Sequence, residues 1–406
     1  MKIFILLLIS KLVSADYLVM VKNENHPFMN ALDSKEAILE KPYPTFIVKE
    51  KPAFKSSNDF IVEENQETYL LEKPLLNDEK YPLQWALDNR GNNEPRRGGG
   101  TIPIPGVVGS DIGIKEVWGS LNFNKKIVVA VVDTGVDHLH VDLKNQMWIN
   151  KLEASGSDGI DDDGNGFVDD INGVDLFNND GDPMDDNMHG THVSGIIGAE
   201  HNNVGIAGVN NNVSIMAVKY MDHKGRGNLA GAIKATKYAV ENGARVVNNS
   251  WGMLKESKIL REYLAFAGKE HGVIFVAAAG NNYKNLDISP LYPAAYRLDN
   301  QITVAALNPE NRMTGFSCYG KETVHTSAPG RNIISTVPGN DYKVLSGTSM
   351  SAPYVAGAVS LLLSKNPSLT PLEIKEKVIN TSVYVDHFKG RTVSEGRLNI
   401  RNLLEL

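Results

Sequence analysis

Short continuous hydrophobic runs alternate along the chain with segments in which hydrophobic residues recur every three or four positions. Four of the runs carry no charge, and they span residues 127–132, 213–218, 246–247 and 273–279. Runs of this kind, rich in β-branched residues, are typical of strands buried on both faces of a parallel sheet. They predict the strands of a central sheet.

Helical spacing appears between and after these runs. Gly243 stops one hydrophobic stripe, which consists of Leu229, Ala232, Ile233, Thr236 and Val240. Residues 349–365 and 371–381 have the pattern of two closing helices. Because strands and helices alternate, the sequence predicts an α/β fold with a mostly parallel sheet flanked by helices.

The N-terminal region has a different texture. A lysine, the apolar run 3–9 and the small residues Val13-Ser14-Ala15 predict a signal peptide over 1–15, with a buried first strand as the alternative. The apolar run is too short to span a bilayer, and no later apolar stretch reaches about 20 residues. Residues 16–73 hold short apolar runs among charged stretches, which predicts a small α+β unit before a larger domain over 74–406.

Composition narrows the class of protein. The 406 residues are 42% hydrophobic and 22% charged, which is normal for a folded soluble chain and excludes a polytopic membrane protein. A net charge of −7 argues against a nucleic-acid binder, which needs a basic face. Cys318 is the one cysteine, so no internal disulfide supports the fold. The Gly- and Pro-rich residues 90–110 predict an irregular surface loop.

The acidity of the chain is concentrated in residues 158–186, which hold eleven Asp and no Lys or Arg. Without them the net charge would be +4. Oxygen-bearing side chains at alternate positions and tight Gly turns resemble the first part of a calcium loop, and the candidate ligands are Asp161, Asp163, Asn165 and Asp169. The twelfth position is Asn172, where an EF-hand has Glu, so the sequence predicts a calcium loop of another kind. A solvated acidic loop is the alternative.

Three motifs carry candidate chemistry. Asp133 ends the strand at 127–132, at the sheet edge where open α/β folds place functional groups. His189 begins one apolar helix and Ser349 begins another. A serine hydroxyl needs a base to become a nucleophile, and the base needs an orienting carboxylate, so these are the three required residue types.

The order Asp, His, Ser separates this chain from two other serine hydrolase folds, the chymotrypsin type and the α/β-hydrolases. The nucleophile motif of α/β-hydrolases is also missing, since the segment 347–351 ends in Ser. All three motifs resemble those of subtilisin-like serine proteases (subtilases), and the similarity runs from about Asn77 to the C-terminus.

The resemblance implies a catalytic role for each motif residue. Asp133 would orient the imidazole, His189 would act as general base and then acid, and Ser349 would attack the scissile carbonyl. The segment 277–281 matches the family motif that ends in the oxyanion-hole Asn281. The backbone N–H of Ser349 would be the second donor. His192 is interpreted as structural, because no third metal-ligand motif accompanies it.

The resemblance also implies a substrate cleft that binds peptides as an added strand. Its expected residues are Gly225, Gly227, Ser250, Trp251, Gly252, Gly280 and Leu291. Leu291 at the floor and Trp251 as a wall predict an apolar P1 preference. The alternative for Trp251 is a place in the core.

Two further features follow from the resemblance. Residues 16–73 occupy the place of an inhibitory pro-domain that the enzyme removes itself, with apolar P1 candidates within 68–71; the alternative is a permanent N-terminal domain. A second calcium site would take Asp78, Asp142 and Asn202, with carbonyl oxygens from Glu200, Val204 and Ile206.

The leading hypothesis is a secreted (or periplasmic), monomeric, calcium-stabilised serine endopeptidase made as a precursor. It would act on proteins and peptides and bind its own pro-domain, with no nucleic-acid partner and no membrane span after signal removal. The alternatives are a catalytically dead relative serving as a calcium-binding scaffold, and a serine esterase or lipase.

Overall fold

The computed structural model describes residues 17–22, 45–48, 60–64, 76–102, 106–120 and 125–405. The chain divides into two compact units, Met1–Lys73 and Pro74–Leu406. In the first unit, β1 (Tyr17–Val21) pairs antiparallel with β2 (Thr45–Val48) and with β3 (Phe60–Glu64). The expected signal peptide and the candidate cleavage region 68–71 lie outside the described residues, and the pro-domain assignment stays a prediction.

The second unit is built on a twisted sheet. In its described part the strand order is β13-β14-β10-β9-β8-β7-β4-β6-β5, and the pairs are parallel except β13 with β14. The strands are β4 (Ile127–Asp133), β5 (Gly173–Asp175), β6 (Val213–Lys219), β7 (Val246–Asn249), β8 (Ile274–Ala278), β9 (Gln301–Leu307), β10 (Thr326–Pro329), β13 (Val383–Tyr384) and β14 (Gly396–Arg397). The four apolar runs became β4, β6, β7 and β8, as predicted.

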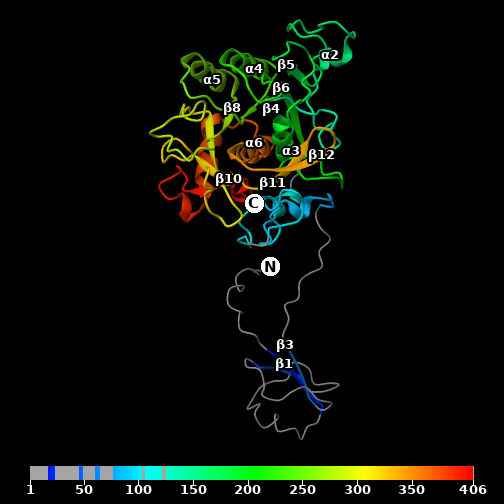
Figure 1. Cartoon of the computed structure of the whole chain (residues 1–406), viewed down its shortest axis with the longest axis vertical. Coiled ribbons are helices and arrows are strands. Elements are labelled where there is room, and N and C mark those ends of the chain that lie inside the picture. Colours follow the sequence, from blue (N-terminus) through cyan, green and yellow to red (C-terminus); the bar gives the residue numbers. More distant parts are fainter. Residues whose placement is uncertain are drawn as a thin grey trace. The chain divides into compact units, whose positions relative to one another are not determined.

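Helices cover both faces of this sheet. Figure 1 shows α4 and α5 on one side of β4, β6 and β8, and α3 and α6 on the other. The helices are α1 (Lys115–Trp118), α2 (Lys151–Ser155), α3 (His189–Gly198), α4 (Leu229–Glu241), α5 (Lys258–His271), α6 (Thr348–Lys365), α7 (Pro371–Asn380) and α8 (Ile400–Leu403). The layers explain why the strands are hydrophobic throughout rather than alternating.

Strand β4 shows the two faces residue by residue. Val129 and Val131 pack into the core on the α3 and α6 side, and Ala130 and Val132 pack into the core on the α4 and α5 side. All four side chains are fully buried. Burial on both sides keeps β4 apolar as far as Asp133, which ends the strand and carries its first polar side chain.

Smaller elements complete the unit. The hairpin β11 (Ile333–Val337) and β12 (Asp341–Leu345) packs on α3 and leads into α6. Short 3-10 helices form at η2 (Tyr81–Leu83) and η3 (Asp386–Phe388). None of the helices in the described ranges has the length and hydropathy that crossing a bilayer requires.

The loop expected at 90–110 is less exposed than its composition predicts. Asn93 and Glu94 are buried, and Glu94 forms an ion pair with Arg331 (Nε–Oε1 3.3 Å) and accepts a hydrogen bond from Asn332. Pro95 bridges to Thr101. The segment is therefore fastened to the body of the domain by polar contacts that composition alone did not reveal.

Candidate active site

The carboxyl end of β4 meets the first residue of α3. His189 Nδ1 lies 2.7 Å from Asp133 Oδ1, which also accepts a hydrogen bond from the backbone N–H of Thr134 (2.8 Å). Asp133 is buried, whereas the His189 side chain is 29% exposed. The structure thus brings together two residues that are 56 positions apart, in the geometry that orients an imidazole.

The electrostatics at His189 favour the imidazolium. Burial is the largest single influence and lowers its pKa, but the charge and hydrogen bond of Asp133, together with the charge of Asp185, outweigh burial and raise the pKa above its ordinary value. A histidine with a raised pKa holds a proton well. This suits a base that must carry a proton between two steps of a reaction.

Ser349 lies in the first turn of α6, which packs against α3. Its Oγ donates a hydrogen bond to the carbonyl oxygen of Ser250 (3.1 Å), and Ser250 Oγ donates in return to the Ser349 carbonyl oxygen (3.0 Å). The expected hydrogen bond between Asp133 and His189 is therefore formed, whereas the Ser349 hydroxyl points to Ser250 instead of His189. Rotation about χ1 re-aims a serine hydroxyl at little cost, and catalytic hydrogen bonds often tighten when substrate binds.

Asn281 follows β8 and is tied to the start of α6. Its Oδ1 accepts hydrogen bonds from Thr348 N (2.9 Å) and Thr348 Oγ1 (3.0 Å). Its Nδ2 lies 3.3 Å from where a Cβ on Gly347 would be. Because Thr348 occupies the oxygen, the NH₂ group remains as a donor beside the segment that carries Ser349.

The expected cleft residues form two groups. A Cβ on Gly252 would lie 2.9 Å from Leu291 Cδ2, and a Cβ on Gly280 would lie 2.8 Å from the same atom. Leu291 therefore packs on both glycines, which lie close in the sequence to Ser250 and Asn281. An apolar side chain in this place is what the predicted P1 preference requires.

The second group lies around Tyr220. Trp251 is partly buried: it packs edge-on against Tyr220 (centroids 5.5 Å apart) and lies against the core on the α4 and α5 side. A Cβ on Gly227 would lie 2.6 Å from the Tyr220 ring. Gly225 sits in the same loop with φ +70°, a conformation that favours glycine.

Cys318 lies close to this region, although the sequence assigned it no role. It is fully buried, its Sγ donates to Asn282 Oδ1 (2.8 Å), and it lies 3.3 Å from where a Cβ on Gly280 would be. The thiol packs behind the loop that carries Asn281.

The second predicted calcium site brings Asp78, Asp142 and the loop after α3 together. Asp78 Oδ1 accepts from Asn202 N (3.1 Å), while Asp142 accepts from Asn202 Nδ2 (3.2 Å) and Ile206 N (3.1 Å). Asn202 Oδ1 accepts from Val204 N, which wraps the loop. Both carboxylates are buried, and desolvation raises the pKa of each. Buried carboxylates with raised pKa values fit a site for a divalent cation, which would favour their charged forms.

Two residues of the acidic insert join Glu153 of α2 in a cluster that the spacing did not predict. Ligand atoms of Glu153, Asp163 and Asp170 lie within 4.8 Å of one another. Among the four predicted ligands only Asp163 belongs to this trio. The others lie around it: Asp161 accepts from Gly164, Asn165 and Gly166 backbone N–H groups, Asn165 Nδ2 donates to Asp163 and Asp170, and Asp169 accepts from Gly159 N. Three converging carboxylates are a ligand set that calcium accepts.

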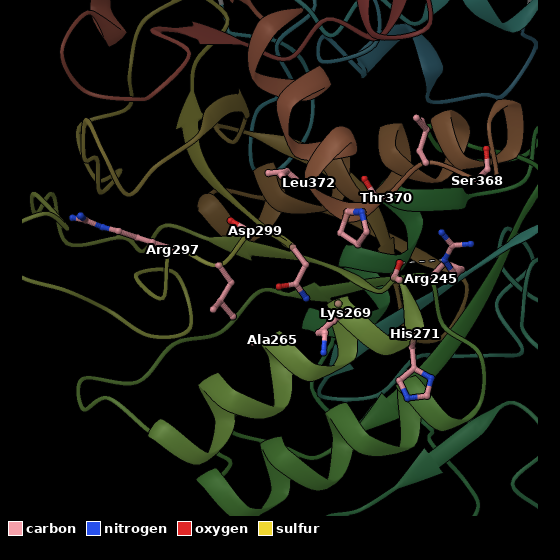
Figure 2. Close-up of a pocket in the computed structure, with 15 residues that line it drawn as sticks. Arg245, Ala265, Lys269, His271, Arg297, Asp299, Ser368, Thr370 and Leu372 are labelled. Carbon is pink, nitrogen blue, oxygen red and sulfur yellow. Dashed lines mark hydrogen bonds between the residues drawn. The ribbon is translucent and has the colours of Figure 1, made fainter.

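A cavity of about 790 Å³ lies elsewhere, at the opposite edge of the sheet. Its lining includes Arg245, Gly272 and Asn300, which precede β7, β8 and β9, and the start of α7. Figure 2 shows Arg245, Lys269 and His271 among the side chains that line it. None of the expected catalytic residues lines this cavity.

Comparison with known proteins agrees with the fold and with the family resemblance. The model of the subtilase family matches residues 124–399. The chain is 33% identical over 351 residues to subtilisin-like protease 1 of Plasmodium berghei (strain Anka), covering 82% of this chain and 55% of that protein. It is 38% identical over 275 residues to a thermophilic serine proteinase of Bacillus sp. (strain AK1), covering 68% and 60%. A crystal structure of a cold adapted subtilisin-like serine proteinase superposes with a TM-score of 0.55 at 26% identity, covering 78% of this chain and 97% of that one.

The chain belongs to the subtilase family. This confirms the family resemblance and the predicted α/β fold class. The chain spans about half the length of the Plasmodium relative.

Proposed function

We propose that this chain is a serine endopeptidase that hydrolyses peptide bonds through an acyl-enzyme. The observation that carries the proposal is the 2.7 Å contact between His189 Nδ1 and Asp133 Oδ1 at the sheet edge where Ser349 and Asn281 also lie. Support also comes from family membership.

The proposed chemistry balances with these side chains. Ser349 Oγ attacks the scissile carbonyl carbon and passes its proton to His189 Nε2. The carbonyl oxygen becomes an oxyanion, which accepts hydrogen bonds from Asn281 Nδ2 and from the Ser349 N–H at the start of α6. The C–N bond then breaks as His189 protonates the leaving amine. Water next attacks the acyl-enzyme carbonyl carbon and gives a proton to His189, and the ester C–O bond breaks as His189 returns that proton to Ser349 Oγ, which releases the acid.

The finer features of the proposal rest on sequence and packing together. Leu291 against Gly252 and Gly280 supports an apolar P1 residue. The N-terminal pattern supports export, and the separate first unit supports a self-cleaved pro-domain that stays a partner until maturation. We propose a monomer as the active form.

A fluorophosphonate probe tests the proposal directly. The wild-type protein should form a covalent adduct that mass spectrometry places on Ser349, and it should cleave a panel of peptides faster than matched esters. A calcium-binding scaffold without catalysis would remain unlabelled. Ester turnover without peptide turnover would favour the esterase alternative.

The oxyanion role of Asn281 predicts a defect in kcat. Asn281→Leu keeps the size of the side chain but removes the donor, so kcat should fall by about 10²–10³-fold. Kinetics on a peptide with an apolar P1 residue measure this. Asn282→Leu, the same change on the exposed neighbour, should retain near wild-type kcat, and equal effects of the two variants would contradict the assignment.

We further propose that calcium stabilises the domain at two sites, the Asp78–Asp142 site and the Glu153–Asp163–Asp170 cluster. The buried carboxylates support this, since each is costly to ionise without a cation nearby. Calcium would act on stability, with no part in the bond-breaking steps.

Chelation should therefore lower the melting temperature. Calcium at ten times its Kd adds about 1.4 kcal/mol per site by mass action. A raised carboxyl pKa means that the folded state binds protons more tightly than the unfolded state, so protons compete with calcium at acid pH. The calcium-dependent rise in Tm should be largest near neutral pH and shrink toward acid pH. Scanning calorimetry of wild type, Asp142→Asn and Asp163→Asn checks this, and equal melting curves with and without chelator would remove both sites.

A further inference from the structure

A buried carboxylate sits four residues before His189. Asp185 is 4% exposed, and both of its oxygens are used. Five donors reach it, namely Thr134 Oγ1 (2.9 Å), Asn187 N (2.9 Å), Met188 N (3.0 Å), Thr191 N (2.9 Å) and Thr191 Oγ1 (2.6 Å). No Lys or Arg is among these donors in the part of the chain that the structure describes. The charge is thus held by neutral dipoles.

Two of these contacts hold a strained residue. Met188 has φ 126° and directly precedes His189. A side-chain-bearing residue rarely adopts this conformation, and it persists when the surroundings fix it. Asp185 Oδ1 accepts hydrogen bonds from the backbone N–H groups of Asn187 and Met188. These two bonds fix the backbone conformation directly before His189.

The remaining contacts connect the two catalytic elements. Thr134, the residue after Asp133, donates to Asp185 and accepts from Gly190 N (3.0 Å). Thr191, in the first turn of α3, donates to Asp185 through both its N–H and its hydroxyl. One carboxylate therefore joins the end of β4 to the start of α3.

We propose that Asp185 is a positioning residue for the proposed endopeptidase, holding the end of β4 and the start of α3 in the register that places His189 on Asp133. It acts through Thr134, Met188 and Thr191 and does not touch the substrate. The inference rests on the proposed function only for its kinetic consequences, because the register itself belongs to the fold.

Asp185 also contributes charge. Together with Asp133 it raises the pKa of His189. Two other ionisable groups lie close in the sequence. Asp186 forms an ion pair with buried Lys219 (2.8 Å). Burial lowers the pKa of His192 to about 3, which leaves that ring neutral. Lys343, on β12, donates to Met188 Sδ (3.9 Å). Asp133 and Asp185 are thus the carboxylates that hold the proton on His189.

The test compares Asp185→Asn with Asp182→Asn, which removes a charge from an exposed carboxylate in the same segment (69% exposed). Full-length proteins are assayed for kcat, KM and the pH dependence of kcat/KM on an apolar-P1 peptide, and the His189 ring is titrated by NMR. Asp185→Asn should lower kcat by about 10–100-fold with little change in KM, the scale expected from misplacing a catalytic group. In this variant the midpoint of the rise of kcat/KM with pH and the midpoint of the His189 NMR titration should both move to lower pH.

Thr191 supplies a second test in case Asp185→Asn does not fold. Thr191→Ser keeps the hydroxyl and should retain the wild-type kcat and pH dependence of kcat/KM. Thr191→Val removes the hydroxyl, so its kcat should fall and the midpoint of kcat/KM against pH should shift. The inference is overturned if Asp185→Asn matches Asp182→Asn, or if Thr191→Val matches Thr191→Ser. If the wild-type protein had no peptidase activity, only the proposed function would be contradicted. The NMR titration of His189 would still test the role of Asp185.

Discussion

Ser349→Ala is expected to abolish labelling by fluorophosphonate and to reduce peptide hydrolysis by roughly a millionfold, the scale established for loss of the nucleophile in a subtilisin. If the precursor cuts itself, the variant should also accumulate as an unprocessed chain of nearly full length. The reason is that no other group in the proposed mechanism can form the acyl-enzyme. Mass spectrometry of the purified protein and a fluorogenic peptide assay measure both outcomes.

Ser351→Ala is the matched control. Ser351 lies on the same helix, is buried, and its Oγ has no hydrogen-bond partner among the described residues, so its removal should leave activity and maturation intact. Maturation of purified Ser349→Ala on its own would refute self-cleavage, and residual labelling at another residue would refute the nucleophile assignment.

Asp133→Asn should reduce kcat by about 10⁴-fold with the fold preserved. The amide can present an N–H to His189 Nδ1, which favours the wrong tautomer of the ring. Steady-state kinetics and a melting curve check this. Retention of more than a tenth of wild-type kcat would show that the 2.7 Å contact is structural rather than catalytic.

The same contact sets the pH dependence of the wild-type enzyme. The general base must be neutral, and the pKa of His189 is raised, so kcat/KM should increase with pH through a midpoint above the ordinary histidine value of 6.5. In Asp133→Asn the influence that remains largest is burial, which lowers the pKa. NMR titration of the ring should therefore move to lower pH in that variant, and an unchanged titration would contradict the electrostatic role of Asp133.

Local hydrophobic patterns predicted much of the central sheet. The strands β4, β6, β7 and β8 were predicted because burial on both faces leaves no polar position inside them. The hairpin of β11 and β12 was not predicted, since polar side chains such as Ser335 and Lys343 interrupt its hydrophobic pattern. Strand β9 was missed as well, and it begins with the buried polar Gln301, whose amide binds the Pro293 and Ala294 carbonyl oxygens.

Some residues of the candidate site could likewise be predicted from local sequence, whereas others could not. Asp133, His189 and Ser349 stand in short motifs, so their identities could be read locally and folding supplied the contact between the first two. The calcium ligands depend on loop closure: Glu153 comes from α2, outside the acidic insert, and reaches Asp163 through chain reversal that spacing does not encode. Asp185 is one of the eleven Asp residues of the insert, and Asp170 and Asp175 are buried as well, so its five donors distinguish it rather than its burial.

The buried thiol of Cys318 determines how the protein responds to redox conditions. With one cysteine, the chain has no internal crosslink to lose, so reducing agents should leave its covalent structure and its melting behaviour unchanged. An alkylating reagent can reach this thiol when the domain opens, and the added group would then crowd Gly280 in the loop that carries Asn281. Inactivation by such a reagent would therefore report local unfolding and give a measure of breathing motions around the active site.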